Sequence, residues 1–405
     1  MAAELSGDPN HQWATFDLGR SRRRLFLDRY INIRPWNSNR VQLQVPPETV
    51  DYVNASYIHL ASQCDPTLEP LRYIAMQGPT PGSVDHVWRM VAEQAQARHG
   101  APVSPPALPP PPVQPASPSN TADLTSTSSP PPAPVSALEP GPIVIVQLTQ
   151  MAEHGVVKCH PYFPSTAVYH DSAPMVINAS DRWRDGWRAT LTFDGAETLE
   201  AGAIEKTRLL LHIRDEEEPR VVWHLLFHRW PDSGVPGDSD IQSFFKLMRL
   251  SRELNSAGNR RIIHCSAGVG RTGTFMALEH LLRELDSGGF EKDPETSHSD
   301  ANQNASRIIS STGGVSLLPP SPPSPPLSPS PSETDSDLDP VFATVDALRA
   351  QRKQMVQTGS QFMFIYSVLR TRWLEKYRGQ CFSAAWDNDG GEPTRKRLGV
   401  ESPTL

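Results

Sequence analysis

Two proline-rich segments limit what this 405-residue chain can fold into. Residues 101–141 and 287–340 hold more than half of its 41 prolines and are otherwise dominated by small and polar residues. Such segments cannot bury enough apolar surface to offset the entropy of ordering, so both are predicted to be disordered inserts. Without the inserts and the chain ends, about 290 residues remain, which fits one domain. We expect that domain to occupy 24–380, between an N-terminal extension (1–23) and a disordered tail (381–405).

The remaining sequence alternates between short apolar runs and amphipathic segments. Three runs are typical of buried strands, at 142–148, 221–227 and 261–265. Helical spacing of apolar residues predicts four helices, at 84–97, 240–254, 272–286 and 341–356. This alternation predicts an α/β fold in which helices cover both faces of a sheet.

Charge and cysteine content argue against several classes of protein. A net charge of -7 and a pI near 6.0 do not suit a general nucleic-acid binder. No apolar run approaches the length of about 18 residues that a membrane span needs. The first residues lack the basic-then-apolar pattern of a secretory signal. Four scattered cysteines are too sparse for a disulfide scaffold or a zinc site: Cys64, Cys159, Cys265 and Cys381. We therefore expect a cytoplasmic protein, and the same features are compatible with a location in the nucleus.

The stretch RRIIHCSAGVGRTGTF (260–275) predicts a strand, a glycine-bearing loop and the start of a helix. This order gathers backbone N–H groups around an anion, and Arg271 adds a planar fork suited to two phosphate oxygens. Cys265 stands at the base of the loop, where the helix terminus, the amides and the guanidinium all favour a thiolate at neutral pH. The loop would thus join a nucleophile to an anion receptor. The alternative is a buried structural cysteine beside an unspecific glycine loop.

Ten residues of this stretch, HCSAGVGRTG, resemble the signature of the cysteine-dependent, tyrosine-specific protein tyrosine phosphatases. The resemblance covers almost all of 24–380 outside the inserts. It implies a single-domain, non-receptor enzyme of fungal-like type, with a twisted mixed sheet flanked by helices. Cys265 would be the nucleophile and Thr272 would stabilise the departing thiolate, although Thr272 could also cap the helix. The phosphate would be held by Arg271 and the loop residues, with His264 in support: Ser266, Ala267, Gly268, Val269 and Gly270.

The reaction also needs a general acid, because a phosphate ester otherwise leaves as a phenoxide. HRWPDSGVPGDSD (228–240) resembles the family's mobile acid loop, which implies Asp232 as the acid and Trp230 as a supporting residue. Proline and glycine around Asp232 suit a hinged flap. The alternative is an ordinary turn aspartate.

MVQTGSQF (355–362) resembles the family's glutamine loop, which implies that Gln357 orients the hydrolytic water and that Gln361 assists it. Arg349 and Arg352 match family arginines by spacing, and we expect them to brace the loops. No cofactor or metal is expected for this chemistry.

Recognition of the substrate is implied by LFLDRYINIRP (25–35), where Tyr30 matches the aromatic wall of the phosphotyrosine pocket. Asp28 stands where the family usually has Asn, and Asn32 where it usually has Asp. Asn32 still offers an acceptor for the substrate backbone, but peptide affinity could be weaker. In MAEHGVVKCHPYFP (151–164), the resemblance pairs Glu153 with Arg271 and brings Lys158 to the acid loop. Three further matches are interpreted as structural: Asn54, Gln77 and Trp88.

Two other functions share parts of this pattern. A phosphoinositide phosphatase would need more positive charge in the loop than the neutral Ala267 and Val269 supply. A phosphotyrosine-binding pseudophosphatase would have lost one of Cys265, Asp232 and Arg271, and all three are present.

Other segments predict regulation and partners in signalling. The expected partners are phosphotyrosine proteins, a MAP kinase at RKRLGV (395–400) and an SH3-type domain at ALPPPPVQP (107–115). Serines that precede proline are predicted targets of proline-directed kinases: Ser104, Ser117, Ser129, Ser321, Ser324, Ser328, Ser330 and Ser402.

Overall fold

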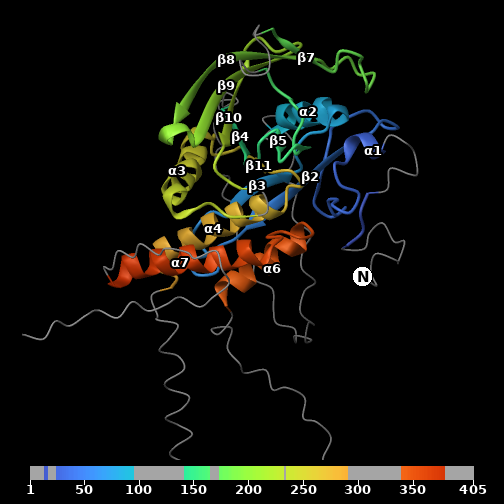
Figure 1. Ribbon diagram of the computed structural model, residues 1–405. Helices are drawn as coiled ribbons and strands as arrows, with labels where there is room; N and C mark the ends of the chain where they lie inside the picture. The colour runs from blue at the N-terminus through green and yellow to red at the C-terminus, as the bar shows by residue number, and fades with distance from the viewer. Residues whose placement is uncertain are drawn as a thin grey trace, which may run out of the picture.

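A mixed β-sheet of nine strands runs through the centre of the computed structural model (Figure 1). The structure describes residues 13–16, 24–94, 141–164, 173–231, 234–290 and 339–378. The strand order is β1-β2-β3-β11-β4-β10-β9-β8-β7, and β5 and β6 form a separate small sheet. The strands are β1 (Arg40–Gln42), β2 (Tyr52–Leu60), β3 (Leu71–Met76), β4 (Ile143–Gln147), β5 (Ala152–Glu153), β6 (Val156–Val157), β7 (Met175–Ile177), β8 (Ala189–Leu199), β9 (Ile204–Ile213), β10 (Arg220–Phe227) and β11 (Arg261–His264).

The four central strands of the sheet are parallel. β11 pairs with β3 on one side and with β4 on the other, and β4 pairs with β10. The remaining pairs in the large sheet, towards both edges, are antiparallel. Because parallel strands end at the same edge of a sheet, the segments after β3, β11, β4 and β10 all emerge together. The predicted strands at 142–148, 221–227 and 261–265 correspond to β4, β10 and β11.

Helices cover both faces of the sheet, as the alternating sequence predicted. Figure 1 shows α4, α6 and α7 together on one side of the central strands and α2 on the other. The helices are α1 (Arg24–Leu27), α2 (Val84–Gln94), α3 (Asp238–Leu254), α4 (Gly270–Asp286), α6 (Pro340–Gln351) and α7 (Gly359–Arg378), with 3-10 turns η2 (Pro81–Ser83) and η3 (Glu200–Gly202). The expected α/β fold, a twisted mixed sheet flanked by helices, is therefore confirmed.

Side chains alternate between two cores along the buried strands. Ile262 and Ile145 pack on the α2 face with Trp88, whereas Ile263 and Val146 pack on the opposite face, which α3, α4, α6 and α7 cover. This alternation follows from the two-residue period of a strand, and it fixes the register of β11 between its neighbours.

The structure corrects several predicted boundaries, most clearly at the end of α6 and at the ends of the second insert. The helix expected at 341–356 ends at Gln351, because Arg352 adopts an extended backbone (φ -149°, ψ 124°) and its side chain enters the core. Residues 287–290 and 339–340, which were assigned to the second insert, belong to the described fold. Asp339 caps α6 by accepting backbone N–H groups of Val341 and Phe342 at 2.9 and 3.1 Å.

Several predictions fall outside the described residues. Within the part of the chain that is described, no helix is long and apolar enough to cross a membrane. The features that lie outside are Asp232, the N-terminal extension except 13–16, most of both inserts, all the Ser-Pro serines, Cys381, the ALPPPPVQP segment and the tail with RKRLGV.

Candidate active site

Three loops meet at the edge where the parallel strands end. One follows β11 and contains Cys265 and Arg271, one follows β4 and contains Glu153 and Lys158, and one follows β10 and leads to residue 232. Since β4 lies between β10 and β11, each loop begins about 5 Å from the next. The resemblance had linked these segments, and the sheet order places them beside one another.

The loop between β11 and α4 owes its shape to glycine. Gly268 has φ +71°, and a Cβ at this position would lie 2.0 Å from the carbonyl oxygen of Met76. Any other residue would therefore displace the loop from the end of β3. On the same side, the N–H of Gly78 donates to the carbonyl of Ser266 at 2.8 Å. The β3 end thus forms the floor of the loop.

Arg352 braces the loop from inside the core. Its guanidinium donates to the carbonyls of Gly268 at 2.9 Å and Ala267 at 3.2 Å. It also donates to Ser56 Oγ at 3.1 Å and Asn54 Oδ1 at 2.8 Å on β2. Burial lowers the pKa of Arg352 to about 10, which still leaves it charged at neutral pH. These contacts hold the carbonyls of Gly268 and Ala267 toward Arg352.

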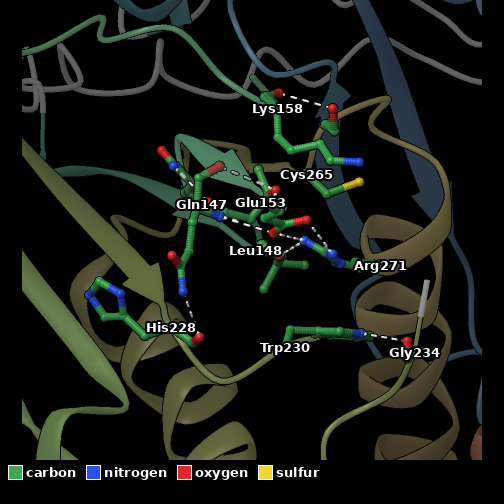
Figure 2. Close-up of polar contacts among 12 residues, drawn as sticks. Gln147, Leu148, Glu153, Lys158, His228, Trp230, Gly234, Cys265 and Arg271 are labelled. Carbon is green, nitrogen blue, oxygen red and sulfur yellow. Dashed lines mark hydrogen bonds and ion pairs between the residues drawn. The ribbon is translucent and has the colours of Figure 1, made fainter. Parts of the chain in front are cut away.

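Arg271 is held in a fixed orientation by Glu153. The guanidinium donates to Glu153 Oε1 at 2.6 Å and Oε2 at 2.8 Å, and to the carbonyl of Leu148 at 3.0 Å (Figure 2). Burial acts to raise the pKa of Glu153, but the hydrogen bonds and charge of Arg271 outweigh it, and the pKa lies below its usual value. A two-point pair of this kind fixes the plane of the guanidinium.

Cys265 is a free thiol that is only 5% exposed. Its carbonyl contacts Nδ1 of His264 at 3.2 Å, and Nε2 of His264 contacts the Tyr162 hydroxyl at 2.8 Å. The same hydroxyl lies 2.9 Å from Nε2 of His224 on β10. Burial lowers the pKa of His264 to about 4. His264 is therefore neutral at physiological pH and supports the cysteine through hydrogen bonding.

Tyr30 and Lys158 reach the same loop from two other segments. The Tyr30 hydroxyl lies 2.8 Å from Ser266 Oγ, which in turn donates to the carbonyl of Lys158 at 3.0 Å. In Figure 2 the ends of the Lys158 and Cys265 side chains are drawn near each other, while the Arg271 guanidinium points to Glu153. Asn32 is exposed two residues beyond Tyr30. The rim of the site is thus built from the segments around 30 and 158.

Asp28, the other departure from the family pattern, has a structural place. Its Oδ1 accepts hydrogen bonds from the Tyr52 hydroxyl at 2.6 Å and from Asn54 Nδ2 at 2.9 Å. Asn54 is the residue that also accepts from Arg352. Asp28 therefore ties the Tyr30 segment to the network beneath the cysteine loop.

The glutamine segment lies against the start of α4. The N–H of Val356 donates to the carbonyl of Val269 at 3.2 Å. Gln361 is buried, and its Oε1 accepts the backbone N–H groups of Gln357 at 3.0 Å and Thr358 at 3.3 Å. Gln357 is exposed beside this turn. Gln361 therefore has a part in holding the turn, which the sequence interpretation had not given it.

Thr272 lies inside the first turn of α4 rather than at its cap. The N-cap residue is Val269, with no side-chain cap hydrogen bond, so the alternative role of Thr272 as an N-cap is wrong. Its Oγ1 is buried and has no hydrogen-bond partner among the described residues. A buried hydroxyl of this kind can bond to a species that arises only during a reaction.

The described residues on either side of 232–233 are bonded to each other, and Asp232 itself lies outside the described residues. Trp230 Nε1 donates to the carbonyl of Gly234 at 2.9 Å (Figure 2). The Trp230 ring packs edge-on against Phe244. Arg229 donates to the carbonyl of Ala201 at 2.5 Å. Trp230 thus sets where the loop leaves and rejoins the fold.

Sequence reasoning missed Arg29. Its side chain donates to the carbonyls of Gly78 at 3.0 Å, Pro79 at 2.6 Å and Val157 at 3.2 Å. It thereby joins the Tyr30 segment to both the end of β3 and β6. The only sequence feature that could have drawn attention to Arg29 is its position next to Tyr30. That position does not predict that the Arg29 side chain bonds to three backbone carbonyls from distant segments. Tyr162 and His224 were missed for the same reason.

Among the described residues, no group of three His, Cys, Asp or Glu side chains could hold a metal ion. The chemical groups gathered at this edge are instead a thiol, a fixed guanidinium and a loop of backbone amides.

Comparisons with known proteins agree with this arrangement. A family model described as protein-tyrosine phosphatase matches residues 25–98, 139–302 and 332–371. The chain is 29% identical over 351 residues to Tyrosine-protein phosphatase 1 of Saccharomyces cerevisiae, covering 84% of this chain and 80% of that protein. It is 31% identical over 268 residues to human Phosphatidylinositol phosphatase PTPRQ, but that match covers 65% of this chain and only 8% of PTPRQ.

Solved structures show the same fold. A structure of PTPN18, solved to explain its recognition of HER2 tyrosine phosphorylation sites, superposes with a TM-score of 0.53 at 20% identity, covering 88% of this chain and 86% of that one. A complex of PTPN18 with HER2-pY1248 phosphopeptides gives a TM-score of 0.52, also at 20% identity, covering 87% and 89%.

Proposed function

The chain belongs to the protein-tyrosine phosphatase family, and from this premise we propose that it hydrolyses phosphotyrosine in proteins through a cysteinyl-phosphate intermediate. Homology supports a hydrolase of the protein-tyrosine-phosphatase class. The observation that carries the mechanism is the set of contacts on the loop after β11. Arg352 fixes its carbonyls, Glu153 fixes Arg271, and Cys265 lies at its base.

In the first step, the Cys265 thiolate attacks phosphorus and the tyrosine oxygen leaves. Charge on the three equatorial phosphoryl oxygens would be met by the loop N–H groups and by Arg271, already in place. Because Glu153 holds the guanidinium plane before substrate arrives, little reorganisation is needed. Asp232 would donate a proton to the leaving oxygen.

In the second step, a water molecule attacks the phosphocysteine and the thiolate leaves. Gln357 would orient this water and Asp232, now ionised, would accept its proton. The partnerless Oγ1 of Thr272 supports a role in hydrogen-bonding the departing sulfur. The products are inorganic phosphate and free enzyme.

Selection of tyrosine would depend on Tyr30. Its hydroxyl contact with Ser266 holds the ring at the edge of the loop, so that a phosphorylated side chain must pass along an aromatic wall. A phosphoserine side chain is shorter by an aromatic ring and would not reach the sulfur. The neutral Ala267 and Val269 argue against a highly charged inositol phosphate, although one relative is named a phosphatidylinositol phosphatase.

A substrate comparison tests the proposal. A phosphotyrosine peptide, the matched phosphoserine peptide and a phosphoinositide are each incubated with the enzyme, and released phosphate is measured. We expect kcat/KM for the phosphotyrosine peptide to exceed that for the phosphoserine peptide and that for the phosphoinositide by about 10³-fold or more. The reason is that only the longer phosphotyrosine side chain reaches the buried loop. Cys265→Ser should abolish turnover, and acid quenching of the wild type should trap phosphate on Cys265. A preference for the phosphoinositide, or turnover by Cys265→Ser, would refute the mechanism.

A further inference from the structure

We propose that the proline-rich segment 316–329 of the second insert binds along one face of α7 within the same molecule. Four half-buried residues line this face, which is called the α7 stripe: Phe362, Tyr366, Leu369 and Trp373. The inference goes beyond the proposed function and does not depend on it.

The α7 stripe is an apolar face that the described fold covers only in part. Its residues recur at intervals of four, three and four, so they lie on one side of the helix. The neighbouring positions Ile365 and Val368 point into the core and are 0% and 4% exposed. Phe362, Tyr366 and Leu369 pack against that core without being enclosed by it, because each keeps part of its surface exposed. The stripe therefore has apolar surface left for a further partner.

Both ends of the second insert are bonded to the stripe itself. Trp373 Nε1 donates to the carbonyl of Phe290 at 2.6 Å, just before the chain leaves the described residues. The Tyr366 hydroxyl donates to Asp339 Oδ2, where the chain re-enters the fold. Residues 291–338 are thus tethered at both ends to the helix. A tethered segment meets a nearby surface at an effective concentration on the order of millimolar, so even a weak contact is populated.

The insert repeats with the period of a polyproline helix. Residues 319–326 read PPSPPSPP, which places a pair of prolines every three residues. A polyproline II helix has three residues per turn, so these pairs recur on one side about every 9 Å. Along α7, Tyr366 and Trp373 are seven residues apart, as are Phe362 and Leu369, which corresponds to about 10 Å. The spacing of the proline pairs therefore matches the spacing of the apolar side chains along the stripe.

The segment and the stripe have complementary chemistry. Proline-rich segments bind to surfaces lined by aromatic side chains, since their extended helix forms in advance and little entropy is lost on binding. Residues 308–332 contain no charged side chain, and three leucines border the repeat, at Leu317, Leu318 and Leu327. Such a segment can cover the rings without bringing a charge out of water.

Charged side chains border the stripe, and those near its C-terminal end have contacts already. Lys376 donates to two carbonyls at the end of α4, and Arg378 lies 5.4 Å from the centroid of the Trp373 ring. Arg370 is exposed midway along the helix. The acidic run ETDSD (333–337) lies just before the re-entry point, so its carboxylates are within reach of Arg370. The uncharged repeat is left to meet the apolar stripe.

The first insert is a poorer occupant, although it too is rich in proline. Its longest proline run, LPPPP (108–112), lacks the period of three. It also follows α2, which covers the opposite face of the sheet (Figure 1). The second insert is favoured because its ends and its repeat both correspond to the stripe.

Photocrosslinking in the full-length protein tests where the segment lies. The photoreactive amino acid p-benzoylphenylalanine replaces Phe362 in one variant and Leu369 in another, and mass spectrometry identifies the cross-linked peptides. Met363 is the matched control position, because it is 57% exposed beside Phe362 but is turned about 100° around the helix. We expect both stripe positions to cross-link to 316–329 with at least about five-fold the yield of the control position. Equal yields, or cross-links spread evenly over 291–338, would mean tethering without binding and would overturn the proposal.

Proline substitutions test the match in spacing. Pro320→Ala, Pro323→Ala and Pro326→Ala together break every pair in the repeat, and they should lower the cross-link yield from position 362 about five-fold. The matched control carries alanine in place of Pro109–Pro111 in the first insert and should keep the wild-type yield. An excess of free peptide with the sequence 316–329 should compete with the cross-link, whereas the same peptide with the three alanines should compete less. An undiminished yield in the triple variant would contradict the assignment to the repeat.

The other outcomes would assign the stripe to a different occupant. Cross-links between two molecules, which give a band of twice the mass, would place a second copy of the chain there. Cross-links to 101–141 would place the first insert there, and either result overturns the proposal. The urea unfolding midpoint of each variant is compared with that of the wild type, and yields are expressed per folded molecule, so that a loss of folded protein does not imitate a loss of binding.

Discussion

The loop after β11 and the loop after β10 leave the same edge of the sheet, but the fold holds them in different ways. The cysteine loop is contacted by three separate segments, through Gly78, Glu153, and the pair Arg352 and Val356. These segments come from β3, the β4–β6 region and the stretch between α6 and α7. The loop is therefore shaped by the tertiary structure before any substrate binds.

The loop after β10, in its described part, combines hydrogen bonds of its own with contacts to η3 and α3. Trp230 Nε1 bonds to Gly234, the N–H of Gly234 donates to the carbonyl of Pro231, and Arg229 bonds to Asp240 at the start of α3. We infer that more of the fold fixes the cysteine loop than fixes the described residues on either side of 232–233. The predictions below test this difference.

The largest effect should come from the acid itself. Asp232→Ala should lower kcat for a phosphotyrosine peptide by about 10³-fold, within the range of a general acid, and should leave KM nearly unchanged. The loss should shrink for an aryl phosphate whose phenol is strongly acidic, because that group leaves without a proton. The wild-type rate should also fall as pH rises past the pKa of the acid, and this descending limb should vanish in the variant. Equal losses for both substrates would indicate a structural role.

The next largest effect on activity should come from Arg352, which braces the cysteine loop. Arg352→Met leaves the carbonyls of Gly268 and Ala267 without their donors, so kcat/KM should fall about 100-fold and unfolding free energy by about 3 kcal/mol. Arg89→Met is the matched control, because Arg89 is a buried arginine paired with Glu93 and Asp185 on the other side of the sheet. It should lose stability and keep its activity per folded molecule. Urea unfolding and steady-state kinetics measure the two effects, and a similar loss of activity in both variants would contradict the brace.

Weakening the ion pair between Glu153 and Arg271 should have a smaller effect on activity. Glu153→Gln keeps the size but removes the charge, and kcat/KM should fall about 10-fold because the guanidinium plane is less fixed. The pKa of Glu153 is lower in the folded protein than in the unfolded chain, so its contribution to stability is present above the unfolded pKa and is lost as pH falls through the folded pKa. Urea unfolding between pH 6 and pH 3 should therefore be less acid-sensitive in the variant. An unchanged pH dependence would show that the pair does not stabilise the fold.

The smallest effect on activity should come from losing the hydrogen bond between Trp230 and Gly234. Trp230→Phe removes the bond to Gly234 but keeps a ring against Phe244, and kcat should fall about five-fold with little change in KM, as expected when only the position of the acid changes. Trp373→Phe is the control, because Trp373 Nε1 donates to the carbonyl of Phe290 at the far end of α4. Pre-steady-state release of the phenol from an aryl phosphate measures the first step, and an equal loss in the control would remove the acid loop from the explanation.

The sequence was sufficient to predict those strands and helices whose residue patterns are local. The β11 strand, the glycine loop and α4 follow directly from RRIIHCSAGVGRTGTF, and β4 and β10 follow from their apolar runs. The end of α6 was mispredicted because helical spacing continues past Gln351, while burial of the Arg352 guanidinium draws the backbone into an extended form. The alternative role of Thr272 as a cap is wrong because the helix begins two residues earlier than predicted, at Gly270.

The sequence by itself determined the family and the chemistry to expect of it, because the cysteine, the glycines and the arginine are neighbours in one short stretch. Only the tertiary structure decided how that stretch is held. Glu153 lies 118 residues before Arg271, and Arg352 lies 84 residues after Gly268. Such bonds depend on sheet order, strand register and helix packing, and no local pattern of residues encodes the distance between two segments that meet only after folding.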